Sequence, residues 1–153
     1  QLDRVPPAME GRDFTLDDLK TLRFALDEDD AVFPVLGPDG KVLALKRRYS
    51  KPYNGQRYLY TTPGHGCPAW CSPDFMEHDE VLIVEGELNA MACYLARPNL
   101  AVMGIAGTNG LLHLDALKGR TVYVYADGDE PGQKARGRWV EQASAAGASD
   151  VYV

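Results

Sequence analysis

The sequence lacks the features that would place the chain in a membrane or an oxidising compartment. Its 153 residues contain no apolar run that approaches the roughly 20 residues of a membrane-spanning helix, and the N-terminus has no apolar core of a signal peptide. The three cysteines are few and odd in number, which argues against a disulfide framework and fits a reducing compartment. Internal repeats and low-complexity tracts are also absent. We therefore expect a globular cytoplasmic protein with no membrane partner.

One block of the chain has no acidic residue, although the net charge of the whole chain is −6. Residues 1–39 and 74–153 each carry a net charge of −6, whereas residues 40–73 carry six basic residues, several aromatic ones and no acid. Basic and aromatic side chains together suit phosphate backbones and bases, although a solvated face is the plainer interpretation of a basic run. We predict a nucleic-acid-binding surface there, made by Lys46, Arg47, Arg48, Lys51 and Arg57.

Acidic residues follow two short apolar runs. Residues 81–84 lead into Glu85-Gly86-Glu87, and residues 122–126 lead into Asp127-Gly128-Asp129. Such runs, ended by glycine-containing turns, are typical of buried strands, and the carboxyl ends of parallel strands form the ligand crevice of an open sheet. If the strands are neighbours, Glu85, Asp127 and Asp129 converge. Like carboxylates repel unless a cation lies between them, so the pattern predicts an Mg²⁺ or Mn²⁺ site, with N-capping as the alternative role of each acid.

The first part of the chain predicts a small lobe of a helix and strands. Thr15 is a suitable N-cap for a helix that continues to about residue 26. Residues 32–36 and 42–45 flank the turn sequence Gly37-Pro38-Asp39-Gly40 and predict a β-hairpin, with a third strand at 57–61. The stretch 62–73 is rich in proline, glycine and cysteine and is interpreted as a linker or an irregular crossover.

From residue 80 onward, strands and helices alternate with short connections. This order predicts an α/β fold with a parallel sheet and helices on both faces. The expected strands are 80–84, 100–103, 121–126 and 151–153, and the expected helices are 87–97, 113–117 and one that begins near Pro131 and ends near Ala146. Because the last strand is short, we expect the chain to be a fragment of a larger protein.

Three motifs in this region resemble the Toprim domain, and in detail the DnaG-type primases of bacteria and phages. They are Val84-Glu85-Gly86-Glu87-Leu88-Asn89-Ala90, Gly107-Thr108, and Asp127-Gly128-Asp129-Glu130-Pro131-Gly132-Gln133-Lys134-Ala135. The resemblance extends upstream over roughly residues 31–153, because 32–35, 40–44 and 57–61 are similar to the small basic subdomain that precedes Toprim in primase catalytic cores. We predict an N-terminal helical segment at 1–30, a basic β subdomain at 31–75 and a Toprim domain at 76–153.

The resemblance implies a metal-dependent nucleotidyltransferase that makes RNA primers on single-stranded DNA from ribonucleoside triphosphates, with a replicative helicase as a further partner. It implies that Asp127 and Asp129 hold Mg²⁺ and that Glu85 serves the metal or proton transfer. Lys46, Arg47 and Arg48 would bind the template. Gly107 and Thr108 are weaker candidates for phosphate contacts, since a plain turn explains them equally well. Lys134, Arg136 and Arg138 are further weak candidates, although solvated side chains are the plainer interpretation of basic residues on a helix.

Two alternatives to primer synthesis stay open. A Toprim nuclease would use the same carboxylates to deliver water, and a non-catalytic module would only bind single-stranded DNA within a helicase-primase. Asn89 favours the second, because the primase pattern has Asp at that position and Asn supplies no charge. His65, Cys67, Cys71 and His78 do not have a usual zinc spacing, so we interpret them as incidental loop residues.

Overall fold

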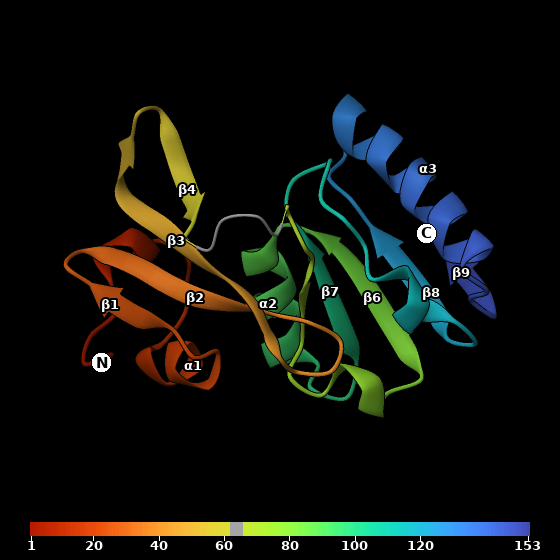
Figure 1. Ribbon diagram of the computed structural model, residues 1–153, viewed down its shortest axis with the longest axis horizontal. Coiled ribbons are helices and arrows are strands. Elements are labelled where there is room, and N and C mark those ends of the chain that lie inside the picture. Colours follow the sequence, from red (N-terminus) through yellow and green to blue (C-terminus); the bar gives the residue numbers. More distant parts are fainter. Residues whose placement is uncertain (62–65) are drawn as a thin grey trace. The chain divides into compact units, whose positions relative to one another are not determined.

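The computed structural model describes residues 1–61 and 66–153, which form two compact units. The first unit contains residues 1–35 and 42–61, and the second contains residues 36–41 and 66–153. Figure 1 shows the elements of each unit. The predicted domain limits at residues 30 and 75 differ from the limits of these units and stay a prediction.

The first unit is a four-stranded sheet with two short helices. The strands follow the order β1-β2-β3-β4, and β1 with β2, like β3 with β4, is antiparallel. Phe24 and Phe33 stack in its core with ring centroids 5.0 Å apart. The elements are η1 (Pro7–Met9), α1 (Leu16–Thr21), β1 (Ala25–Asp27), β2 (Asp30–Leu36), β3 (Val42–Tyr53) and β4 (Gln56–Tyr60).

The first helix is shorter than the sequence predicts. Thr15 caps it as expected, in a capping box with Asp18. The helix ends at Thr21, however, because Arg23 takes a left-handed conformation with φ of 64°, which no helix continues through. Residues 25–27 then pair with β2 as a strand that was not predicted from the sequence.

The second unit is a five-stranded, mostly parallel sheet. Its order is β5-β7-β6-β8-β9, in which only β5 runs antiparallel, against β7. The α/β fold class with a parallel sheet is therefore confirmed. The elements are β5 (Trp70–Cys71), η2 (Phe75–Glu77), β6 (Glu80–Glu85), α2 (Glu87–Ala96), β7 (Ala101–Ile105), η3 (Leu114–Leu117), β8 (Thr121–Tyr125), α3 (Glu130–Ala145) and β9 (Asp150–Tyr152).

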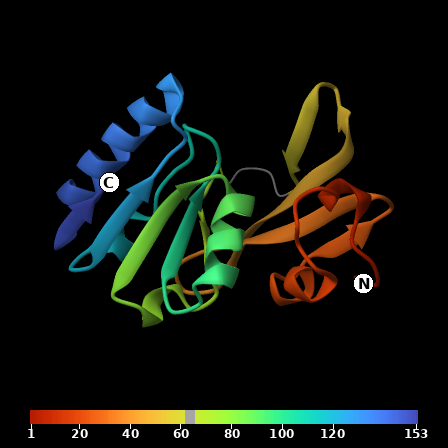
Figure 2. The ribbon, with the colours of Figure 1, turned by 180° about the vertical axis from the view of Figure 1, so that it is seen from behind.

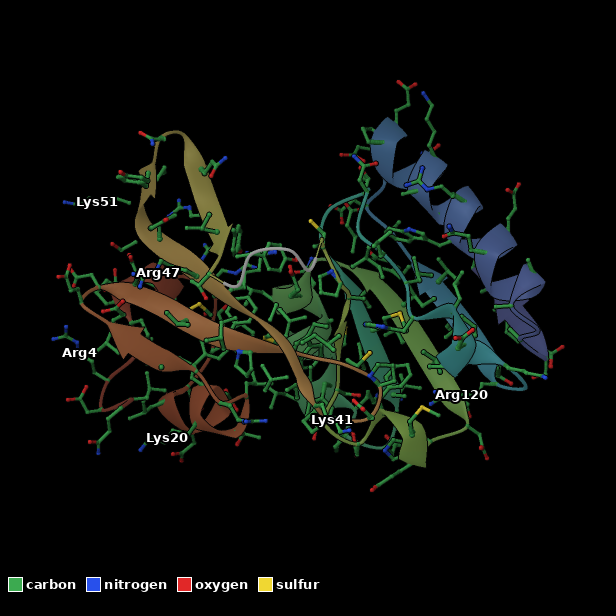
Figure 3. The ribbon with its side chains drawn as sticks, viewed as in Figure 1. Arg4, Lys20, Lys41, Arg47, Lys51 and Arg120 are labelled. Atoms are coloured by element: carbon green, nitrogen blue, oxygen red, sulfur yellow. The ribbon has the colours of Figure 1, made fainter. Side chains whose placement is uncertain are left out.

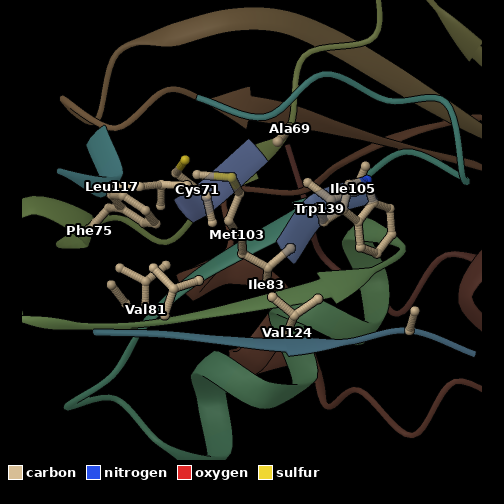
Figure 4. Close-up of a cluster of buried hydrophobic side chains, with 14 of the residues drawn as sticks. Ala69, Cys71, Phe75, Val81, Ile83, Met103, Ile105, Leu117, Val124 and Trp139 are labelled. Atoms are coloured by element: carbon tan, nitrogen blue, oxygen red, sulfur yellow. The ribbon is translucent and has the colours of Figure 1, made fainter. Parts of the chain in front are cut away.

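Helices cover both faces of this sheet, as predicted. Alternate residues of β6 and β8, among them Ile83 and Val124, pack with Trp139 of α3 in the main hydrophobic cluster (Figure 4). Helix α2 lies against the other face and stands in front of the sheet in Figure 2. It comes so close to β7 that a Cβ added at Gly104 would lie 2.6 Å from the Cβ of Ala90. Glycine at this position therefore sets the distance between helix and strand.

The side chain of Arg120 joins three segments near the amino end of β8 (labelled in Figure 3). Its guanidinium donates hydrogen bonds to the carbonyl oxygens of Phe75, His78 and Ala116, and its Cζ lies 4.6 Å from the centre of the Phe75 ring. Arg120 itself is buried. Burial lowers its pKa, but a buried charge with this many acceptors is well satisfied. Arg120 thus fixes η2 and η3 to the start of β8.

The stretch 62–73 is only partly the irregular crossover that was predicted. Residues 62–65 lie outside the described residues. Trp70 and Cys71 form β5, which pairs with Met103 and Gly104 of β7, so the prediction of a linker was wrong there. Two residues are too short a run to show a strand period, which is why no strand was predicted at this position. Among the described residues, no helix is long and apolar enough to cross a membrane.

Candidate functional site

The two acidic motifs lie side by side at one edge of the parallel sheet. Strands β6 and β8 are parallel neighbours, with Val84 beside Tyr125, so the residues that follow each strand meet at the same edge. The backbone N–H of Asp127 donates a hydrogen bond to Oε2 of Glu85 over 3.2 Å. Glu85 is half-buried and Asp127 is exposed. The strands that precede the two acidic motifs are therefore neighbours, as the prediction requires, and the backbone of Asp127 contacts the carboxylate of Glu85.

Asp129 is held by the helix that it starts. Its side chain caps α3, because Oδ1 accepts a hydrogen bond from the backbone N–H of Gly132 over 2.8 Å. The close turn needs glycine, since a Cβ at position 132 would collide with the carbonyl oxygen of Asp127. Asp127 and Asp129 are thus positioned by the same short segment, and Gly132 allows that segment to fold back on itself.

Asn89 supports the other motif. Its side-chain Nδ2 donates a hydrogen bond to the carbonyl oxygen of Glu85 over 3.0 Å, across the turn at Gly86. Gly86 has φ of 87°, a conformation that suits glycine, and its own N–H bonds to the Ile105 carbonyl over 2.7 Å. A carboxylate at position 89 could not donate this bond. The residue that departs from the primase pattern is therefore used here to fix the backbone of Glu85.

The carboxylate oxygens of these acids are the kind of donor that suits a hard divalent cation. Glu85 and Asp129 each use one oxygen for a backbone N–H, and a carboxylate has capacity for further partners. Within the described part of the chain, however, no three His, Cys, Asp or Glu side chains are grouped closely enough to form a ready metal site. Capping of α3 turns Asp129 toward its own helix, so the convergence of all three carboxylates on one ion stays a prediction.

The loop after β7 and the start of α3 meet next to these acids. A guanidinium nitrogen of Arg138 donates a hydrogen bond to the carbonyl oxygen of Thr108. Thr108 and Lys134, both predicted as weak phosphate contacts, line the same pocket, whereas Gly107 is exposed outside it with φ of 62°. Arg136 and Arg138 were weighed from the sequence as further phosphate contacts, with solvated side chains as the plainer interpretation, and of these two Arg138 lines the pocket. Its spacing of four residues from Lys134, which places both on one helix face, was the available signal.

Three of the predicted template-binding residues make contacts within the first unit. Lys46 is buried, with Nζ 4.9 Å from the centre of the Tyr58 ring and 4.8 Å from that of Tyr60. The guanidinium of Arg48 donates hydrogen bonds to the Ala8 carbonyl and to the Tyr58 hydroxyl. The sequence pattern did not show the contact with Ala8, because that residue lies far from the basic strand pair in the sequence.

Arg47 is held by two carboxylates, those of Asp27 and Asp30. The hydrogen bonds that the Arg47 guanidinium donates to these carboxylates, the one to Asp27 above all, raise the pKa of Arg47. Burial opposes the charge of Asp30, but hydrogen bonds from the Ser50 N–H and from Arg47 outweigh it and lower the pKa of Asp30. The first unit as a whole has nine acidic residues and nine Lys or Arg residues. The positive charge of its basic strands is therefore balanced by the acidic residues that precede them in the sequence.

Lys51 and Arg57 are the exposed members of the predicted basic surface. Both lie toward the tip of the hairpin of β3 and β4, and Figure 3 shows Lys51 pointing outward from it. Arg57 donates hydrogen bonds to the carbonyl oxygens of Tyr49 and Ser50 over 3.3 Å and 3.2 Å. Tyr53 on the same hairpin is 63% exposed. An exposed aromatic ring and two exposed cations on one hairpin are suitable contacts for single-stranded nucleic acid.

The histidine and cysteine residues do not form a zinc site in the described part of the chain. Cys71 is buried in β5, and burial raises the pKa of its thiol. His78 pairs with Asp74 through Nε2 and Oδ2 at 2.9 Å. Cys67 is exposed, and His65 lies outside the described residues. Cys71 is therefore a strand residue and not the incidental loop residue that was predicted.

Comparison with known proteins finds a family match for part of the second unit and several structures with a similar fold. Residues 82–153 match the Toprim-like family model. In fold, the chain is similar to the primase fragment of the bacteriophage T7 primase-helicase, with a TM-score of 0.61, 14% identity and coverage of 100% of this chain and 64% of that one. It is also similar to the zinc-binding and RNA polymerase domains of the Aquifex aeolicus primase, with a TM-score of 0.60, 17% identity and coverage of 88% and 39%.

A third similar structure is the DnaG primase catalytic domain bound to single-stranded DNA, with a TM-score of 0.62, 15% identity and coverage of 89% and 57%. The chain thus spans less than two thirds of the length of each of these three structures. No curated protein matches the sequence. At these identities the structural matches show the fold, and the family model covers the part of the chain that carries the two acidic motifs. Residues 82–153 are therefore similar to the Toprim-like family, and the chain has the fold of the catalytic cores of DnaG-type and phage T7 primases.

Proposed function

We propose that the chain is part of a primase that joins ribonucleotides into short RNA primers on a single-stranded DNA template. The observation that carries this proposal is the hydrogen bond between Asp127 and Glu85, which joins the two acidic motifs at the carboxyl edge of the sheet. The fold of primase catalytic cores makes primer synthesis the first activity to test for such a site.

In this proposal the acidic residues bind and orient a divalent cation. Asp127 and Asp129 hold Mg²⁺ or Mn²⁺ through carboxylate oxygens, and Glu85 completes the site or accepts the proton of the attacking hydroxyl. When bound, the cation lowers the pKa of the 3′-hydroxyl and neutralises charge on the transferred phosphate. The hydrogen bond from the Gly132 N–H to the Asp129 side chain and the one from the Asn89 side chain to the Glu85 carbonyl keep the two motifs in place before any ligand arrives.

The first unit would bind the template. Its exposed hairpin, with Lys51, Tyr53 and Arg57, offers cations for phosphates and a ring for a base. Lys46, Arg47 and Arg48, which were predicted for this role from the sequence, also hold the strands of this unit together through their contacts with neighbouring side chains and carbonyls. We further propose a cytoplasmic protein whose partner is a replicative helicase.

The test is primer synthesis by the full-length protein on single-stranded DNA with labelled ribonucleoside triphosphates and Mg²⁺ or Mn²⁺. We expect short oligoribonucleotides and an intact template. Asp127→Ala should lower the rate by orders of magnitude, because a catalytic metal supplies several kcal/mol of transition-state stabilisation. Binding of single-stranded DNA through the first unit should change little.

The same assay separates the alternatives. Metal-dependent cleavage of DNA or RNA without nucleotide incorporation would replace the primase by a Toprim nuclease. Absence of both activities, with single-stranded DNA binding retained, would identify a non-catalytic module. The observation that favours this last alternative is that residue 89 is not a fourth carboxylate but an asparagine, whose side-chain amide donates to the Glu85 carbonyl.

A further inference from the structure

A pocket of about 410 Å³ lies beside the acidic motifs in the second unit, between the loop after β7 and the first turns of α3. We propose that this pocket binds a phosphate group, and that its occupant in the reaction is the phosphate chain of the incoming nucleoside triphosphate. The inference rests on the proposed function for the identity of the nucleotide, but the phosphate site itself is argued from the pocket. Its lining residues are Thr108, Glu130, Pro131, Lys134 and Arg138.

The positive charge of the pocket comes from one face of α3. Lys134 and Arg138 are four residues apart and share that face, whereas Arg136 is exposed on α3 but does not line the pocket. A hydrogen bond from Arg138 to the Thr108 carbonyl fixes the guanidinium at the pocket wall. A guanidinium has five N–H donors, so this bond leaves most of them for a phosphate.

The side chains, and not the helix end, must carry this site. The backbone N–H groups of Gly132 and Gln133 are already bonded to Asp129, through its side chain over 2.8 Å and its carbonyl over 2.9 Å. The start of α3 is therefore occupied by its own cap. An anion that enters the pocket finds the ammonium of Lys134 and the guanidinium of Arg138 as its charged donors.

Lys134 has a partner that a phosphate can replace. Its Nζ lies 2.7 Å from Oε1 of Glu130, and the two side chains are 72% and 79% exposed. An ion pair this exposed contributes little to stability, so exchanging the carboxylate for a phosphate of higher charge costs little. Glu130 should then compete with the phosphate, and its removal should strengthen phosphate binding.

The pocket lies next to Asp127 and Asp129, and this position favours a nucleotide whose phosphates carry a divalent cation. Asp127 and Asp129 immediately precede α3, and their negative charges oppose a free polyphosphate at the same edge of the sheet. A divalent cation on these acids removes the opposition. We therefore expect phosphate binding in the pocket to increase strongly when Mg²⁺ is present.

The test measures binding, not synthesis. Isothermal titration of the purified protein with ATP and Mg²⁺, and with inorganic tripolyphosphate and Mg²⁺, gives the affinity of wild type and single variants. Lys134→Ala and Arg138→Ala should each weaken both ligands by about tenfold, the effect of one lost charge-assisted hydrogen bond. Arg136→Ala, which removes the same charge from the same helix, should change neither by more than about twofold. Glu130→Gln should tighten both.

A parallel titration with a single-stranded oligodeoxynucleotide identifies the source of the phosphate. Loss of ATP and tripolyphosphate affinity with unchanged oligonucleotide affinity assigns the pocket to the nucleotide, and the reverse assigns it to the DNA backbone. Equal effects of Arg136→Ala and Lys134→Ala, or no ATP or tripolyphosphate binding by wild type, would overturn the phosphate site. Lys134 has no described contact besides the exposed pair with Glu130, so its variant will fold and keeps the test decisive.

The phosphate pocket and the primase activity can fail independently of each other in these experiments. Primer synthesis with an unchanged KM for nucleotides in Lys134→Ala would refute the pocket and leave the primase intact. ATP binding that depends on Lys134 in a protein that makes no primers would support the pocket and refute the primase.

Discussion

The backbone N–H of Asp127 donates a hydrogen bond to the carboxylate of Glu85 across 42 positions of sequence, over 3.2 Å. The bond uses the main chain of Asp127 and leaves its own carboxylate exposed. Replacing that carboxylate by an amide therefore changes the charge of the site and keeps the contact between the two motifs. This separation of backbone and side chain allows the metal role to be tested without unfolding the site.

Asp127→Asn should weaken Mn²⁺ or Mg²⁺ binding by about tenfold or more, which corresponds to about 1.4 kcal/mol. The rise of the melting temperature that metal produces in wild type should shrink accordingly. Calorimetric titration and thermal melts check both effects. Glu141→Gln removes an acid from the exposed surface of α3 and serves as the control. Equal metal affinity of parent and Asp127→Asn would remove this carboxylate from the site.

Gly132→Ala should destabilise the protein by about 1–3 kcal/mol, the usual cost of an added methylene group in a packed position. The new Cβ would collide with the Asp127 carbonyl oxygen, so the segment that holds both aspartates must move. Metal affinity should fall together with stability, as measured by urea denaturation and titration.

Gly137→Ala is the matched control for that change. Gly137 also lies in α3, but nothing lies within 4 Å of the position of its Cβ. Alanine there should stabilise the helix by about 0.5–1 kcal/mol, since glycine is unfavourable inside helices. A similar loss in both variants would mean that α3 tolerates no alanine and that the close approach at Asp127 is not the cause.

Asn89→Asp should destabilise the metal-free protein by about 1 kcal/mol, because a carboxylate cannot donate the hydrogen bond to the Glu85 carbonyl and its charge lies near Glu85. Saturating Mg²⁺ should restore part of this loss, since the added charge favours a cation. Melting temperatures with and without Mg²⁺ check the prediction. Asn99→Asp, at the other end of α2, should show no metal-dependent difference. If Asn89→Asp behaves like Asn99→Asp, the side chain of residue 89 does not face the site.

The double variant Lys51→Ala, Arg57→Ala should reduce the salt dependence of single-stranded DNA binding by about 1.4, which is two contacts at roughly 0.7 each. Fluorescence anisotropy over a series of salt concentrations measures this slope. Arg47→Ala should instead lower the stability of the first unit, because it leaves Asp27 and Asp30 without their guanidinium. A slope that changes only in Arg47→Ala would reverse these assignments.

Stability should fall in acid in a way that depends on Asp30. Its pKa is lowered in the folded protein, so the charged form is favoured by folding. This contribution is fully present above the unfolded pKa of about 3.9 and is lost as the pH falls through that value toward the lower folded pKa. Asp30→Asn should therefore be less stable than wild type at pH 7, and the difference should narrow below about pH 4. Urea denaturation at both pH values is the measurement, with Asp3→Asn as an exposed control. A difference that is constant with pH would exclude the carboxylate charge as its origin.

The order of elements in the second unit could be predicted because each strand and helix there is marked by a pattern in its own residues. Apolar runs and glycine turns mark β6, β7 and β8, and the right-handed rule for parallel strands leaves few ways to arrange them. The neighbourhood of Glu85 and Asp127 follows from that arrangement. The use of Asp129 as the cap of α3 is also local, and it was weighed as the alternative to a metal role.

What could not be predicted depends on partners far away in sequence. The acid-free block was interpreted as a free basic surface, but Arg47 pairs with Asp27 and Asp30, and Arg48 reaches the carbonyl of Ala8. Neither pairing leaves a trace in the block itself. Arg23, whose left-handed conformation ends α1, is likewise fixed by packing and not by its intrinsic preference.

The contacts of Arg120 have a consequence for how this protein can change over evolution. They tie η2, η3 and β8 together at the amino end of the sheet, whereas the acidic motifs and the loop of Thr108 lie at the carboxyl end. The Arg120 contacts thus lie at the end of the sheet opposite the acidic motifs. Insertions, deletions and charge changes in the loops at the carboxyl end would leave the Arg120 contacts intact. New binding specificities can therefore arise in those loops by small steps while the framework is retained.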